Sequence, residues 1–177
     1  LVANTFKLKL ISASASKTDK HDALVLAKLL AAHLLPTVWV PPQAVRELRS
    51  LTQHRTQLVG QRNALKNQLH AMLHRHNLSL PDEGSPFLTT QESWWTSLPL
   101  TAGEQLQVRH CWLTLQHLRT LIEETEALIA QLSVNNTWNE FMTRLVQIPG
   151  VGLFSGMTIL SAIGDITRFP SARHLVG

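Results

Sequence analysis

The chain has 177 residues, of which 44% are hydrophobic and 16% are charged. This composition allows a sizeable core and excludes a chain that is disordered throughout. No apolar run approaches the roughly 20 residues of a membrane-spanning helix, and the first residues lack the charged-then-apolar pattern of a signal peptide. The single cysteine, Cys111, excludes an internal disulfide framework and a zinc site built from thiolates. We therefore expect a cytoplasmic protein without a membrane segment.

Charge is distributed unevenly along the chain. Residues 1–79 contain eleven Lys and Arg against three Asp and Glu, a balance of +8, whereas residues 80–177 contain five against nine, a balance of −4. A basic half of this size is typical of a surface that meets a polyanion, because Lys and Arg release counterions when they neutralise phosphates. A solvated face with surplus charge explains the same numbers, so charge alone leaves both interpretations open.

The first apolar stretch is short. The alternation in residues 6–10, FKLKL, fits either a strand or a turn of helix. Residues 12–16, SASAS, predict a loop. After this loop, Thr18 or Ser16 is in place to cap a helix that continues to Leu30.

A short strand is predicted for residues 37–40, TVWV. It is expected to be buried and to end at Pro41 and Pro42, because proline lacks the N–H group that a strand pairs. A helix between two strand-like pieces is typical of an α/β layer. We therefore assign residues 1–42 to the C-terminal part of an α/β domain.

Residues 43–76 predict one long basic helix. They contain no proline, and their apolar positions alternate in spacings of three and four, as in a heptad seam. Two seam positions are arginines, Arg55 and Arg62, which are unfavourable there unless an opposite charge meets them. We favour side chains that reach solvent or bridge to another helix over a contact with nucleic acid. The seam consists of Leu48, Leu51, Arg55, Leu58, Arg62, Leu65, Leu69 and Met72.

Residues 77–102 contain several prolines and form a connector, whose Trp94 and Trp95 are expected to pack on the helices rather than stack on bases. A second helix with the same spacing follows and ends at Asn135. Two such helices favour an antiparallel coiled-coil hairpin over residues 43–135. Sustained heptads also allow a homo-oligomer through the coiled coil. The second seam consists of Val108, Cys111, Leu115, Leu118, Ile122, Thr125, Ile129 and Leu132.

The sequence LVQIPGVGLFSGMTI, residues 145–159, resembles a helix-hairpin-helix motif. Gly150 and Gly152 permit positive φ and close backbone approach, so that N–H groups of the hairpin meet a phosphate whatever the base sequence. An ordinary tight turn between packed helices is the alternative. Gly156 and Phe154 depart from the motif, which usually has an alanine and a polar or basic residue at these positions.

Asp19 and Asp22 stand three residues apart at the start of a predicted helix, so they share one face. The helix dipole favours acidic residues at this end, and the spacing on its own favours that structural role. A pair of carboxylates on one face is also half of a Mg²⁺ site, because this cation binds one or two carboxylates together with phosphate oxygens and water.

Four features in this order resemble a DEDD-type insertion-sequence transposase. They are KTDKHDA at residues 17–23, a short strand ending in VPP, a long basic helix containing RNALKNQLHAML, and IPGVGLFSGMTILSAIGDITRFPSARHLVG at residues 148–177. In this RuvC-like family a structured bridge RNA pairs donor with target DNA. The resemblance therefore implies DNA and a structured guide RNA as partners.

The resemblance also implies roles for individual residues. Asp19 and Asp22 match the last two members of the family's catalytic quartet of Asp, Glu, Asp and Asp, which ligates Mg²⁺ in a ribonuclease-H-like site. The first two members lie upstream in relatives, and the family's serine nucleophile follows the stretch that matches residues 171–177. We therefore expect a fragment that lacks both ends and is inactive alone.

The predicted fold is mainly α. It comprises a remnant of a RuvC-like α/β domain at residues 1–42, the coiled-coil hairpin at 43–135, and the start of a helical C-terminal domain with a helix-hairpin-helix-like motif at 136–177. The predicted function is part of a transposase or recombinase that cleaves and rejoins DNA strands. The alternatives are a non-catalytic nucleic-acid-binding coiled-coil module and a structural dimeriser. The residues predicted to contact nucleic acid are Arg46, Arg49, Arg55, Arg62, Lys66, Arg75, Gly150 and Gly152.

Overall fold

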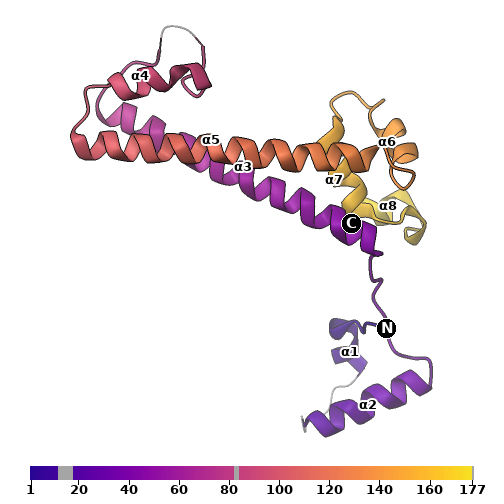
Figure 1. The fold of residues 1–177 in the computed structure, drawn as a ribbon. Coiled ribbons are helices and arrows are strands. Elements are labelled where there is room, and N and C mark those ends of the chain that lie inside the picture. Colours follow the sequence, from indigo (N-terminus) through magenta and orange to yellow (C-terminus); the bar gives the residue numbers. More distant parts are fainter. Residues whose placement is uncertain (12–17, 82–83, 177) are drawn as a thin grey trace. The chain divides into compact units, whose positions relative to one another are not determined.

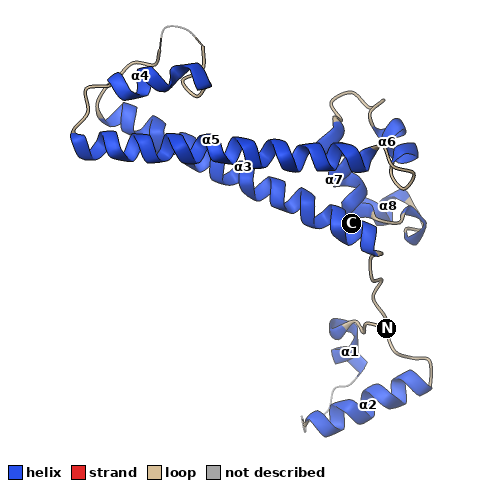
Figure 2. Cartoon of the chain, viewed as in Figure 1, coloured by secondary structure: helices blue, strands red, loops and turns tan. Residues whose placement is uncertain are grey.

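The computed structural model describes residues 1–11, 18–81 and 84–176. Within these residues the chain is mainly helical, as predicted, and none of them forms a strand of a sheet (Figure 2). The chain divides into two compact units, Leu1–Pro42 and Gln43–Gly177. In the part that the structure describes, no helix is both long enough and apolar enough to cross a membrane.

The first unit contains two helices, α1 (Thr5–Ile11) and α2 (Asp19–Ala31). Residues 6–10 are therefore helical, which excludes the strand alternative. The Oγ1 atom of Thr18 accepts a hydrogen bond from the His21 N–H at 3.3 Å, so Thr18 caps α2 as predicted. The other predicted cap, Ser16, and the loop predicted for residues 12–16 lie outside the described residues.

The predicted buried strand at residues 37–40 is wrong. Thr37 forms only an isolated antiparallel bridge with Ala3, flanked by a 2.9 Å hydrogen bond from the Val38 N–H to the Val2 carbonyl. Val38 and Val40 are both exposed. A strand is stabilised by neighbours along its whole length, and this segment meets another segment at a single point.

Helix α2 forms without burying any of its side chains. Its leucines remain in contact with solvent, and Leu30 is 53% exposed; Phe6 of α1 is 74% exposed. Its own residues account for the helix, because residues 19–31 contain no glycine or proline and follow a threonine that caps the first turn. The described part of the first unit therefore has helices but no hydrophobic core.

Two long helices dominate the second unit (Figure 1). α3 (Gln43–Arg75) and α5 (Ala102–Ser133) confirm the long helices that the heptad spacing predicts. α5 begins at a capping box, in which the Thr101 and Glu104 side chains each bind the other's backbone N–H. The shorter elements are η1 (Thr89–Gln91), α4 (Glu92–Ser97), α6 (Asn139–Leu145), α7 (Leu153–Ile163), η2 (Ile166–Arg168) and α8 (Ala172–Val176).

The two seams face each other along α3 and α5, and every seam residue is buried or half-buried. Leu69 shares a core cluster with Cys111, whereas Leu58, further toward the start of α3, shares one with Ile122. Residue numbers rise along one helix as they fall along the other, so the pair is antiparallel. The burial drives the pairing, because apolar side chains leave water on both helices.

An aromatic cluster closes one end of the hairpin. Trp95 of α4 is 1% exposed and packs between Phe87 and Trp112, and its indole N–H donates to the Pro86 carbonyl at 2.7 Å. Trp94 meets the Trp95 ring edge-on, with ring centroids 4.8 Å apart. The prediction that these tryptophans pack on the helices is confirmed.

The opposite end of the hairpin holds the C-terminal helices (Figure 1). α7 contacts both α3 and α5, and Met157 of α7 is fully buried. α6 packs on α7 through Gly156, where an added Cβ would lie 2.8 Å from the Met142 Sδ atom. The absence of a side chain at Gly156 therefore permits the close approach of α6, which accounts for one of the two departures from the helix-hairpin-helix motif.

Candidate nucleic-acid interface

Asp19 and Asp22 occupy the first turn of α2, as predicted, and both are exposed. Among the described residues neither carboxylate forms an ion pair, and no group of three or more His, Cys, Asp and Glu is placed to hold a metal ion. Mg²⁺ usually binds only one or two protein carboxylates and keeps water or phosphate oxygens as its other ligands, so two exposed carboxylates on one turn suit it. The catalytic and metal-binding roles of the pair stay predictions.

Arg46 and Arg75 lie on α3, near opposite ends of this helix, and both are exposed. The other predicted basic residues of α3 are half-buried. A phosphate in solution can therefore reach Arg46 and Arg75, whereas the fold partly surrounds the other four side chains.

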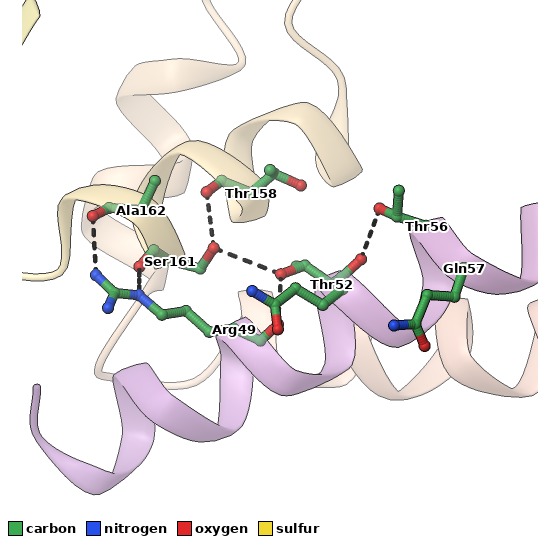
Figure 3. A pocket seen from close by; sticks show the side chains of 8 residues that line it. Arg49, Thr52, Thr56, Gln57, Thr158, Ser161 and Ala162 are labelled. Carbon is green, nitrogen blue, oxygen red and sulfur yellow. Dashed lines mark hydrogen bonds between the residues drawn. The ribbon is translucent and has the colours of Figure 1, made fainter. Parts of the chain in front are cut away.

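Arg49 ties α3 to the end of α7 (Figure 3). Its Nε donates to the Ser161 carbonyl at 2.5 Å and its Nη2 donates to the Ala162 carbonyl at 2.9 Å. These carbonyls belong to the last turn of α7, where intrahelical partners are missing and a cation is favoured. Arg49 therefore has a structural role, and its contact with nucleic acid stays a prediction.

Arg55 bridges α3 and α5. Its Nε and Nη2 atoms both bind the Glu126 Oε1 atom, at 2.9 and 2.7 Å. The guanidinium also lies over the Phe154 ring, 4.6 Å from its centroid. Of the two favoured interpretations of this seam arginine, reaching solvent and bridging to another helix, the bridge is confirmed, and the Phe154 ring stacks on the same guanidinium.

A groove of about 420 Å³ lies between α3 and α7 (Figure 3). Hydroxyl groups line much of it, and helix carbonyls already accept from them: Thr56 Oγ1 donates to the Thr52 carbonyl at 2.8 Å, and Ser161 Oγ donates to the Thr158 carbonyl at 2.7 Å. The amides of Gln53 and Gln57 are exposed at its edge. Sequence reasoning missed this groove, because no local pattern shows that α7 packs here.

A turn that contains Gly150 and Gly152 joins α6 and α7, which contact each other; these two helices and their turn are the α6–α7 hairpin. Gly150 adopts φ +87°, which favours glycine, whereas Gly152 has φ −89° and ψ −178°, which any residue adopts. Both glycines are exposed, and Gly152 is the N-cap of α7 without a side-chain hydrogen bond to the helix. The first N–H groups of α7 are thus not capped by a side chain, which is the arrangement that a phosphate can use.

Comparison with known families shows two matches. Residues 2–78 match the family model of IS110-type DEDD transposases, described as a transposase, and residues 142–177 match the model described as the transposase IS116/IS110/IS902 family. Both stretches of the chain are therefore similar to transposase domains of the IS110/IS116 family. All ten predicted site residues lie within the two matched stretches.

Two curated relatives carry the same description. The putative transposase y4qE of Sinorhizobium fredii is 29% identical over 161 residues, which are 91% of this chain and 38% of the relative. The transposase for insertion sequence element IS1111A of Coxiella burnetii is 24% identical over 171 residues, covering 90% of this chain and 44% of the relative. The chain therefore spans about two fifths of these relatives. No solved structure matches it significantly.

Proposed function

We propose that this chain is part of an insertion-sequence transposase that cleaves and rejoins DNA strands, with α3 and the α6–α7 hairpin contacting nucleic acid. The observation that carries the proposal is the packing of α3 on α7, through Arg49 and the Ser161 and Ala162 carbonyls. These helices come from the two matched transposase stretches. Their contact places α3, the basic helix, and the α6–α7 hairpin in the same compact unit.

The hairpin is proposed to bind the sugar–phosphate backbone of DNA or of a structured guide RNA. Support comes from the exposed Gly150 and Gly152 and from the uncapped start of α7. Exposed Arg46 and Arg75 of α3 are proposed to add phosphate contacts.

Substitution of Gly152 tests the hairpin contact. Asp and Asn are both good N-cap residues, and nothing lies within 4 Å of a Cβ at this position, so Gly152→Asp and Gly152→Asn should both fold at least as well as the parent chain. Only Gly152→Asp places a negative charge where the phosphate is expected. We expect its affinity for duplex DNA, measured by fluorescence anisotropy, to fall at least fivefold while Gly152→Asn keeps most of the affinity. Equal affinities would contradict the contact.

Salt dependence tests the contribution of α3. Each phosphate contact steepens the dependence of log affinity on log salt by about 0.9 for duplex DNA. We expect Arg46→Gln to reduce the magnitude of this slope by about 0.9, which corresponds to the loss of one phosphate contact. Arg109→Gln, which removes an exposed arginine of α5, is the matched control and should leave the slope unchanged. A chain that binds neither DNA nor structured RNA at low salt would exclude the proposal and favour a structural role.

Asp19 and Asp22 are proposed to hold part of a Mg²⁺ site. When bound, the ion would supply charge stabilisation at the oxygens of a phosphate under attack. The two carboxylates would hold it, together with water and phosphate oxygens. In a Mg²⁺ titration followed by amide NMR signals, we expect changes at the first turn of α2 that Asp19→Asn and Asp22→Asn abolish. Glu47→Gln, at an exposed carboxylate of α3, should leave these changes intact; their persistence in both aspartate variants would contradict the site.

The hairpin geometry limits how a homo-oligomer can form. The predicted oligomer would use the coiled coil, yet both seams are buried against each other within one chain. A second copy could reach the same seam only after α3 and α5 separate. An oligomer that keeps this hairpin would need another surface, and its existence stays a prediction.

A further inference from the structure

A cavity of about 210 Å³ lies between the middle parts of α3 and α5. Three of the side chains around it are cationic, namely Arg62 and Lys66 from α3 and Arg119 from α5. Two carboxylates, Glu123 and Glu126 of α5, complete its polar lining. The helix pair therefore contains a cluster of charged side chains beside the apolar residues of its seams.

The two seam arginines of α3 differ sharply. Arg55 has its guanidinium matched by Glu126. Arg62 lies two turns further along the same seam, and its Nε atom is shielded from solvent without any hydrogen-bond partner among the described residues. A buried donor without an acceptor is unfavourable, so the Arg62 Nε atom is a donor that a bound anion can satisfy.

Two further cations, Arg119 and Lys66, lie at the same cavity as Arg62. Arg119 donates from Nη2 to the Phe87 carbonyl at 2.9 Å, and the Lys66 Nζ atom lies over the Phe87 ring, 4.9 Å from its centroid. Burial lowers the pKa of Lys66, and the positive charges of Arg62 and Arg119 lower it further. Three like charges thus converge on one cavity and repel one another.

The carboxylates around the cavity do not balance these charges. Glu126 already binds Arg55. Glu123 is exposed and forms no ion pair within the part of the chain that the structure describes. Three cations therefore face one carboxylate that is not engaged elsewhere.

We propose that this cavity binds a phosphate group, whose oxygens accept hydrogen bonds from Arg62 Nε and neutralise Lys66 and Arg119. Guanidinium groups suit phosphate because they present several donors in one plane, and the negative charge of a phosphate group offsets part of the repulsion among three cations. The site differs from the hairpin contact proposed above. A free phosphate ion and a phosphodiester of a nucleic acid both present anionic phosphoryl oxygens that accept hydrogen bonds, so the site stands even if the proposed function fails.

Thermal unfolding of the 177-residue chain tests the site. At matched pH and ionic strength, inorganic phosphate should raise the Tm above its value in chloride, with saturation as the phosphate concentration increases. Arg62→Gln should abolish this rise, and Arg109→Gln, at an exposed arginine of α5 to which no binding role is assigned, should retain it. Equal Tm values of the parent chain in phosphate and chloride would overturn the proposal, as would an undiminished rise in Arg62→Gln.

Glu123→Gln provides a second test that does not depend on how Arg62→Gln folds. If the cavity binds phosphate, removing the nearby carboxylate should strengthen phosphate binding and leave the Tm in chloride unchanged or higher. If Glu123 is instead the counterion of Arg62 in solution, Glu123→Gln should lower the Tm in chloride and leave the response to phosphate unchanged. That second result would overturn the proposal.

A short oligothymidylate distinguishes the two sources of phosphate. If Arg62→Gln loses the effect of inorganic phosphate and also binds the oligonucleotide at least fivefold more weakly, the site serves a nucleic-acid backbone. If only the effect of inorganic phosphate is lost, the site serves a free ion. Either result supports the phosphate site, whereas retention of both effects in Arg62→Gln contradicts it.

Discussion

A larger share of α2 than of α3 is apolar, yet α3 is the helix that buries its apolar side chains. α2 of the first unit buries none of its side chains, and Leu30 is 53% exposed. In the second unit, Leu48 and Leu69 of α3 and Ile129 of α5 are fully buried. The contrast teaches that a cap and helix-favouring residues set where a helix begins and runs, whereas a core requires a second helix with a matching seam.

Removal of a core side chain gives the largest expected difference between the two units. Trp95→Ala should lower the free energy of unfolding by about 3–5 kcal/mol, because it empties the aromatic cluster at the closed end of the hairpin. Leu30→Ala in α2 should change it by no more than about 0.5 kcal/mol, because that side chain is largely exposed. Urea unfolding followed by circular dichroism measures both. Similar losses would show that α2 has a core partner.

The hairpin turn gives the next largest effect. Gly150→Ala should destabilise the second unit by about 1–2 kcal/mol, because φ +87° places a Cβ close to backbone atoms. Gly152→Ala, whose backbone is extended, is the matched control and should cost less, about 0.5 kcal/mol, because alanine is a poorer N-cap than glycine. Hydrogen exchange should show faster exchange in α6 and α7 of Gly150→Ala and no change in α2. Faster exchange in α2 as well would show that the opening of the first unit depends on the stability of the second unit.

A stabilising change in the middle of α3 should be smaller. Gly60 lies within this helix with nothing within 4 Å of a Cβ, so Gly60→Ala should raise the free energy of unfolding by about 0.5–1 kcal/mol. The gain comes from the lower conformational entropy of alanine in the unfolded chain. It should appear in urea unfolding of the second unit. A loss of stability would mean that this part of α3 needs the flexibility of glycine.

Acid should weaken the capping box of α5, which is the smallest effect expected. A hydrogen bond from the Thr101 side chain, followed by one from His76 and one from the Thr101 backbone, lowers the pKa of Glu104 from 4.5 to about 2. A carboxyl with a depressed pKa stabilises the fold above its unfolded-state pKa, and this contribution is lost as pH falls toward 2. Glu104→Gln should therefore flatten the dependence of Tm on pH between about 4.5 and 2, whereas Glu124→Gln, an exposed glutamate of the same helix, should not.

Local patterns in the sequence anticipated the parts of the fold that depend on nearby residues. The alternating spacing of apolar residues predicted α3 and α5, and Thr18 marked the start of α2. The strand predicted for residues 37–40 was wrong, because β-branched residues favour a strand only where another strand lies beside them. The same limit applies to the candidate site, since spacing placed Asp19 and Asp22 on one helical turn but could not show what faces them.

What the sequence determined alone is where the long helices run and which of their residues form the seams, because spacing, caps and prolines act over a few residues. Tertiary structure alone decided how each arginine of α3 is used. Arg55 meets a carboxylate 71 positions away, Arg49 meets carbonyls more than 100 positions away, and the Nε of Arg62 meets no acceptor among the described residues. The register of α3 against α5 and α7 sets these contacts, and no local pattern encodes that register.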